Sequence, residues 1–126
     1  MIEARHDGLG SYQFHCENAE QFLFTENESN LQRLWGVPNH SPFVKDSIND
    51  AVIQNKIDIV NPGKTGTKAA AHYRSIIEPN DSRTIRLRLR KIDNHRSPAD
   101  SVAPLSQTHS PPSSALRVRL SQRERG

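Results

Sequence analysis

Residues 22–73 place the tightest limit on the fold, because turn-forming residues interrupt every run in this stretch that is long enough for a helix. Gly36, Pro38 and Pro42 restrict any helix there to roughly two turns. Polar residues alternate with apolar anchors such as Trp35, the only tryptophan of the chain. This pattern is typical of a long, irregular surface loop that folds against a rigid scaffold.

Short helices are compatible with this region. Residues 31–35 have apolar side chains at helical spacing, which predicts one turn of helix with Ser29 or Asn30 as its N-cap. Residues 43–53 fit a helical stripe only loosely, and their pattern does not decide between helix and loop.

Short strands are predicted beside this region. In residues 11–17 apolar and polar side chains alternate, with Tyr12, Phe14 and Cys16 on one face, which predicts a half-buried strand. The apolar run 22–24 predicts a second strand, because runs of this length are typical of short buried strands.

A β-hairpin is predicted near the end of the ordered part. Residues 68–77 and 83–90 flank Pro79–Ser82, whose residue types favour a turn. Three apolar residues of the second strand share one face, which we expect to lie on the core: Ile85, Leu87 and Leu89. The predicted fold is mainly β, a partial antiparallel β-sandwich of residues 1–91 with a long irregular loop region.

Residues 92–126 differ in composition from the rest of the chain. They are rich in Ser, Pro and Arg and contain no aromatic residue. Such a segment buries too little apolar surface to offset its conformational entropy, so a disordered basic tail is predicted. Residues 116–120 alternate, but five residues alone do not make a stable strand.

Composition also disfavours several classes of function. One cysteine, Cys16, cannot form an internal disulfide, and the six histidines have no metal-ligand spacing, so we expect no metal and no cofactor. No apolar run is long enough for a bilayer and no secretory signal is seen, so we expect no membrane contact and a cytoplasmic location. The arginine-rich strand 83–91 lacks interleaved aromatic residues, which disfavours nucleic-acid binding.

Carboxylates in the loop region are the candidates for chemistry. Glu26, Glu28, Asp46 and Asp50 flank the irregular loop, and paired carboxylates can serve as general acid and base. The favoured interpretation is structural: Asp46 and Asp50 cap backbone N–H groups or pair with Lys45 and Arg33.

Four motifs follow one another along the chain: FTEN at 24–27, GVPN at 36–39, PFVKDSIND at 42–50 and NPGKTGTKAAAHY at 61–73. As a linked run they resemble bacterial-type glucosidases related to glycoside hydrolase family 63, the mannosyl-oligosaccharide glucosidase group. Those proteins have Tyr and Gly where this chain has Phe43 and Ser47. The resemblance covers residues 1–90.

The resemblance implies a non-catalytic role for this chain. In the family this segment lies in an N-terminal β-sandwich domain, and the two catalytic carboxylates belong to a separate (α/α)6 barrel that this chain lacks. The implied function is a truncated segment of a glucosidase-like hydrolase, inactive alone, whose partner is an oligosaccharide or the absent barrel. Because the tail resembles translation in a shifted reading frame, we expect barrel-coding sequence in another frame of the downstream DNA.

Two alternatives stay open. One is a stand-alone β-module that contacts carbohydrate or another domain, and the weaker one is a nucleic-acid binder that acts through the basic tail. The possible carbohydrate or domain contacts are Glu26, Asn27, Trp35, Asn39, Lys45, Asp46, Asn49 and Asp50.

Overall fold

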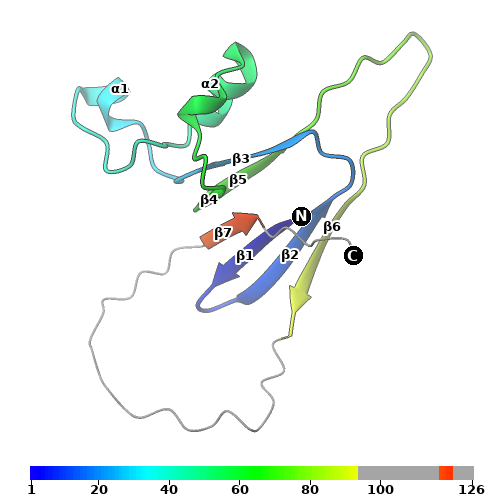
Figure 1. Ribbon diagram of the computed structural model, residues 1–126, viewed down its shortest axis with the longest axis horizontal. Helices are drawn as coiled ribbons and strands as arrows, with labels where there is room; N and C mark the ends of the chain where they lie inside the picture. The colour runs from blue at the N-terminus through cyan, green and yellow to red at the C-terminus, as the bar shows by residue number, and fades with distance from the viewer. Residues whose placement is uncertain (94–116, 121–126) are drawn as a thin grey trace, which may run out of the picture.

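The computed structural model describes residues 1–93 and 117–120, and these form a mainly β structure with two antiparallel sheets (Figure 1). The elements in chain order are β1 Ile2–His6, β2 Gly10–Cys16, β3 Gln21–Thr25, α1 Leu31–Trp35, α2 Ser47–Gln54, the 3-10 helix η1 Ile57–Ile59, β4 Thr65–Gly66, β5 Lys68–His72, β6 Leu87–Ile92 and β7 Arg117–Leu120. In the described residues no helix is long and apolar enough to cross a membrane.

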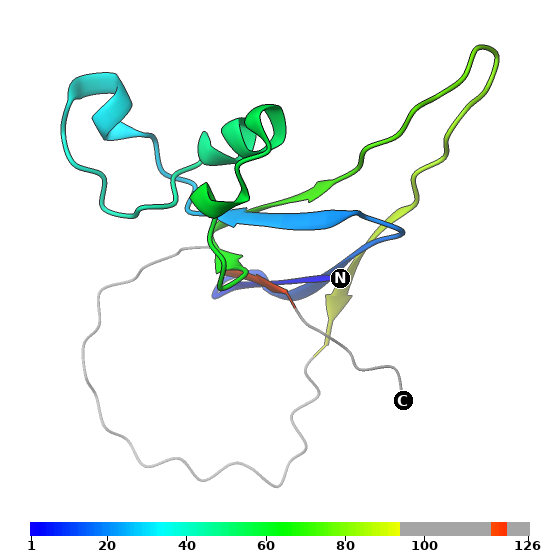
Figure 2. The same ribbon diagram turned by 45° about the horizontal axis from the view of Figure 1, so that its top comes forward.

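The two sheets differ in size. Sheet A has the strand order β4-β7-β1-β2-β6, and sheet B consists of β3 and β5. Sheet B lies between sheet A and the helices (Figure 2), so the molecule has three layers. A partial antiparallel sandwich, as predicted, is therefore the core of the structure.

Strand β3 connects the three layers because its side chains alternate between two faces. Phe24 is fully buried and packs with Ile2 and Val118 of sheet A. Leu23, on the opposite face, packs with Ala51 of α2 and with Val60. One short apolar run thus fixes both the sandwich core and the position of the helical layer.

The predicted strands at 11–17 and 22–24 are confirmed as β2 and β3. The predicted helical turn is confirmed as α1, with Asn30 rather than Ser29 as its N-cap. Residues 43–53, left open by their pattern, contain most of α2.

The predicted hairpin of residues 68–77 and 83–90 is wrong. The turn exists, since the Asp81 N–H donates to the Glu78 carbonyl oxygen at 3.0 Å. The strands do not pair with each other, because β5 pairs with β3 in sheet B and β6 pairs with β2 in sheet A. Residues 74–86 are exposed and run from one sheet to the other as an arm that extends from the sheets (Figure 1).

The apolar face of the last predicted strand is also less buried than expected. Leu87 and Leu89 lie opposite Cys16 and Phe14 and share their face of the sheet. They are 56% and 65% exposed, and Ile85 is 46% exposed. The reason is the unequal size of the sheets, because two strands of sheet B do not cover all five strands of sheet A.

The predicted boundary at residue 91 and the predicted disorder of 92–126 need two corrections. Ile92 belongs to β6, and residues 117–120 form β7, which pairs with β1 and β4. Val118 is buried against Ile2 and Phe24, so pairing on both sides supplies the stability that an isolated strand lacks. The remainder of the predicted tail lies outside the described residues.

Candidate functional site

Helix α1 is held by a small network of amide side chains at its start. The side-chain oxygen of Asn30 accepts from the Arg33 N–H at 3.1 Å and from the Asn39 Nδ2 at 3.0 Å. Asn39 in turn accepts from the Gln32 N–H at 3.1 Å. The helix ends at Gly36, whose φ of 68° is the left-handed conformation that glycine adopts without strain. These contacts fix a helix of only five residues.

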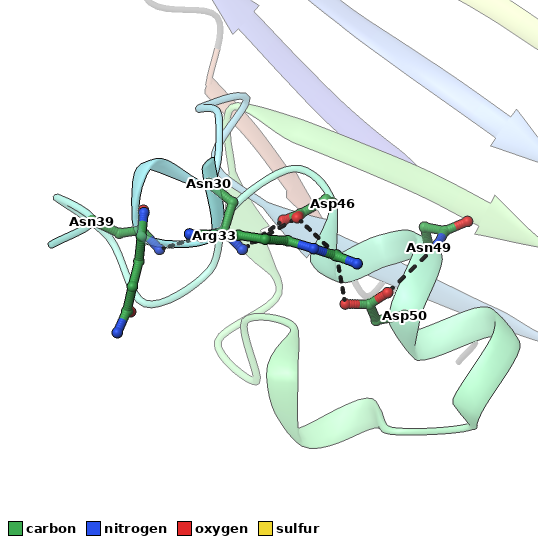
Figure 3. Close-up of polar contacts among 7 residues, drawn as sticks. Asn30, Arg33, Asn39, Asp46, Asn49 and Asp50 are labelled. Carbon is green, nitrogen blue, oxygen red and sulfur yellow. Dashed lines mark hydrogen bonds and ion pairs between the residues drawn. The ribbon is translucent and has the colours of Figure 1, made fainter. Parts of the chain in front are cut away.

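Arg33 connects α1 to α2 through both candidate carboxylates (Figure 3). Its Nη1 lies 3.3 Å from Asp46 Oδ2 and 3.5 Å from Asp50 Oδ2. Asn30 Nδ2 donates to both oxygens of Asp46 at 3.2 and 3.3 Å. The predicted pairing of these carboxylates with Arg33 is confirmed. The predicted cap at Asp46 is absent, since its side chain makes no cap hydrogen bond to α2.

Glu26 and Asn27 take part in a different contact, at the connection between β4 and β5. The Thr67 hydroxyl donates to Glu26 Oε2 at 2.6 Å and accepts from the Asn27 N–H at 2.7 Å. The Glu26 N–H donates to the Phe43 carbonyl oxygen at 2.8 Å. These bonds attach the first residues after β3 to the sheet, which is an anchoring role.

The remaining candidates are on the surface of the helical layer. Asn49 is exposed and its Nδ2 lies 3.5 Å from Asp50 Oδ1. Lys45 is exposed, and no ion pair of its ammonium group is formed within the described residues, so its predicted pairing is not observed there. Its backbone N–H donates to the Glu28 carbonyl oxygen at 3.0 Å.

Trp35 lies at the end of α1 and is 68% exposed. Its neighbours Leu34 and Val37 are 57% and 50% exposed, and α1 buries none of its own residues. We call Leu34, Trp35 and Val37 the α1 patch. A short helix that is tied down by polar contacts while its apolar residues face outward is suited to contact with something outside this chain.

The arrangement does not resemble the carboxylate pair of a glycosidase. Inverting enzymes place two carboxyl groups about 6.5–9.5 Å apart on opposite sides of the scissile bond, with space for a water molecule. Here one guanidinium contacts both carboxylates. Nucleophilic chemistry is disfavoured as well, because burial raises the pKa of the Cys16 thiol. The described residues also contain no cluster of three metal ligands.

A cavity of about 460 Å³ opens beside β3, away from these candidates. Its walls include Phe22, Leu23, Ile57 and Val60. None of the eight predicted contact residues lines it. The candidate residues therefore lie outside this cavity, and Glu26, Asn39, Asp46 and Asp50 are half-buried while the other four are exposed.

Sequence reasoning did not select Asn30, Arg33 and Thr67 as site residues. Asn30 and Arg33 had signals, namely the N-cap preference of Asn and a cation three residues later that can reach nearby carboxylates. Thr67 had no signal, because its contacts are with residues about forty positions earlier in the chain.

The chain is 43% identical over 67 residues to an uncharacterized protein of Saccharomyces cerevisiae, and the match covers 51% of this chain. The matched part is 6% of the length of the yeast protein. No family model matches the chain, and no solved structure matches it.

Proposed function

We propose that this chain is a non-catalytic segment of a glucosidase-like glycoside hydrolase, and that its helical layer contacts the catalytic (α/α)6 domain of such a protein. The four linked motifs at 24–27, 36–39, 42–50 and 61–73 support the relationship. The match to a small part of a much longer yeast protein is compatible with a role as one segment of a larger molecule.

The observation that carries the contact role is the α1 patch. Arg33 and the amides of Asn30 and Asn39 hold α1 in place, while Trp35 is 68% exposed. The side chain of Trp is amphipathic and rigid, and tryptophan is enriched at the centres of protein interfaces. The carboxylates of the loop stabilise this surface, since both are engaged by Arg33.

Absence of glucosidase activity in the chain alone is the first test. The purified chain, incubated with an aryl α-glucoside, is expected to release no more phenol than a heat-denatured control. A variant with both Asp46→Asn and Asp50→Asn serves as the matched sample. Turnover that the double substitution removes would contradict the non-catalytic role.

The fluorescence of Trp35 tests the contact itself, because it is the only tryptophan. Addition of a tryptophan-free (α/α)6 domain from a glucosidase of this family is expected to shift its emission to shorter wavelength as the ring is buried. Trp35→Phe should weaken binding, measured by calorimetry, less than Trp35→Ala. Binding that is equal for the native chain and Trp35→Ala would exclude the α1 patch.

A stand-alone carbohydrate-binding module is the second candidate, favoured by an exposed tryptophan near amide side chains. In that case maltotriose alone would quench Trp35 emission, and Trp35→Ala would abolish binding. Nucleic-acid binding through the basic tail is a weaker candidate, whose mark would be an affinity that falls steeply with salt. A cytoplasmic location stays a prediction of the sequence.

A further inference from the structure

Strand β6 forms one edge of sheet A, and β4 forms the other edge. One edge of β6 pairs with β2, and no described strand pairs with the other. We call this second edge, with the side chains of residues 85–91, the β6 edge. It comprises different residues from the α1 patch, so it can be tested separately.

The backbone of β6 directs alternate residues to its free side. The Glu17 N–H donates to the Arg86 carbonyl oxygen at 3.1 Å. Hydrogen-bonded pairs alternate in an antiparallel ladder, so the backbone groups of Arg88 and Arg90 point toward β2. Those of the intervening residues, Leu87, Leu89 and Lys91, point outward. Unpaired outward groups are a template for another strand.

The side chains of the β6 edge present two chemically different faces. Ile85, Leu87 and Leu89 are exposed on the side that is continuous with the sandwich core. Arg88 and Arg90 lie on the opposite side, where their partners across the ladder are His15 and Gln13 rather than carboxylates. A strand that pairs here would be complementary if apolar residues alternate with acidic ones, because opposite charges on neighbouring strands stabilise a sheet.

A second copy of this chain does not satisfy these requirements. Antiparallel pairing of β6 with itself sets a leucine opposite a leucine only in the registers that place Arg88 opposite Arg86, Arg88 or Arg90. Each of these places like charges opposite one another, which destabilises pairing.

We propose that the β6 edge binds an extended, acidic segment of a partner protein as an added strand, with apolar residues over Leu87 and Leu89 and carboxylates beside Arg88 and Arg90. Main-chain hydrogen bonds then supply affinity, and the alternating side chains supply specificity. The exposed apolar end of the sandwich is covered in the same step.

The test uses the full 126-residue chain, labelled with ¹⁵N, and a seven-residue peptide that alternates Glu and Val. The peptide is expected to bind and to protect the amides of Leu87, Leu89 and Lys91 from exchange. The amides of Arg88 and Arg90 should change little, because they already point toward β2. The matched peptide with Lys in place of Glu should not bind.

Charge reversal provides the matched variants. The double substitution Arg88→Glu and Arg90→Glu should weaken the Glu peptide at least about tenfold, because attractive cross-strand pairs become repulsive. It should also confer binding of the Lys peptide. The double substitution Arg74→Glu and Arg83→Glu, an equal change of charge on the arm, should leave both affinities unchanged. Leu89→Pro removes an outward N–H without a loss of ladder bonds and should also weaken binding.

Several results would overturn the proposal. These are equal binding of the two peptides, protection of amides outside residues 85–92, and self-association of the chain through β6 in sedimentation. Displacement of the Glu peptide by oligothymidylate, with no protection at Leu87 and Leu89, would assign the arginine face to nucleic acid instead. If Trp35 emission does not change in these titrations, the peptide binds at the β6 edge and not at the α1 patch.

Discussion

At the scale of single residues, Gly66 is a point of close approach between β4 and β3. A Cβ atom at this position would overlap the Thr25 carbonyl oxygen and lie 2.9 Å from the carbonyl carbon. Both are backbone atoms within a buried strand, so they have little freedom to move. Gly66 therefore sets how near the short strand β4 can lie to sheet B.

We expect Gly66→Ala to lower the free energy of unfolding by about 1–3 kcal/mol, because the added methyl group overpacks this site. Urea unfolding followed by far-ultraviolet circular dichroism measures the change. Gly8→Ala is the control, since a Cβ there meets only the His6 ring at 3.6 and 3.7 Å. Equal unfolding midpoints for the two variants would refute the close approach of β4 and β3.

Asn30 has two roles, as N-cap of α1 and as donor to Asp46. Asn30→Ala removes both, and we expect a loss of about 1–2 kcal/mol together with lower fluorescence anisotropy of Trp35. The stability of Asn30→Asp should lie between that of the native chain and that of Asn30→Ala. The aspartate keeps a capping oxygen but places a second carboxylate beside Asp46. Ser29→Ala should have no effect, since Ser29 does not cap α1.

The Cys16 thiol predicts a pH dependence. Burial raises its pKa in the folded chain above the ordinary value of 9.0. The folded state then holds the proton more tightly, so this contribution to stability is present below pH 9.0 and is lost as the pH rises through the folded pKa. Iodoacetamide at pH 8 should react more slowly with the native chain than with the urea-unfolded chain. Equal rates would show that Cys16 is not buried.

Part of the candidate site could be predicted from the sequence. Pairing of Asp46 and Asp50 with Arg33 follows from residue types and was expected. The central position of Asn30 did not follow, because a local pattern gives an N-cap but no information about which distant side chain shares the same amide. The contact of Glu26 with Thr67 joins a residue just after β3 to one between β4 and β5, so it depends on how these strands lie in the fold.

At the scale of elements, β7 is a short strand whose stability depends on the strands beside it. Val118 contacts Ile2 and Phe24 in the core between the sheets. We expect Val118→Ala to cost roughly 1–3 kcal/mol through the cavity it leaves, and Val118→Asp to unfold the sandwich. Leu9→Ala, at a position that is 59% exposed, is the matched control for loss of an aliphatic side chain. Thermal unfolding measures the melting temperature of each variant. It should be highest for Leu9→Ala, lower for Val118→Ala and lowest for Val118→Asp.

The elements with strong local patterns were predicted, and their partners were not. Alternation at Tyr12, Phe14 and Cys16 identified β2, and the turn at Pro79–Ser82 was correct. The error was to pair the strands on either side of that turn. Nearness in sequence favours a hairpin, but the ladder groups of β5 are used by β3 and those of β6 are used by β2. Strand β1 pairs with both β2 and β7. It was not predicted because its sequence is largely polar.

At the scale of the whole molecule, the arm of residues 74–86 joins β5 of sheet B to β6 of sheet A. We expect trypsin to cut at Arg74 or Arg83, because the arm is exposed. The pieces should remain together in gel filtration, since β6 pairs with β2 and β7 pairs with β1. Mass spectrometry identifies the cut, and separation should require urea. Pieces that separate without urea would show that the pairing of β6 and β7 does not hold them to the rest of sheet A without the arm.

The strand order of sheet A has a consequence for synthesis on the ribosome. Strands β1 and β2 emerge first, but the neighbour of β1 on its other side is β7, more than a hundred residues later. The hairpin of β1 and β2 must therefore wait, with one edge unpaired, until residue 120 has left the exit tunnel. Non-local pairing of this kind slows folding and exposes strand edges to aggregation. Until β7 has been made, the outer edge of β1 therefore stays without its partner strand.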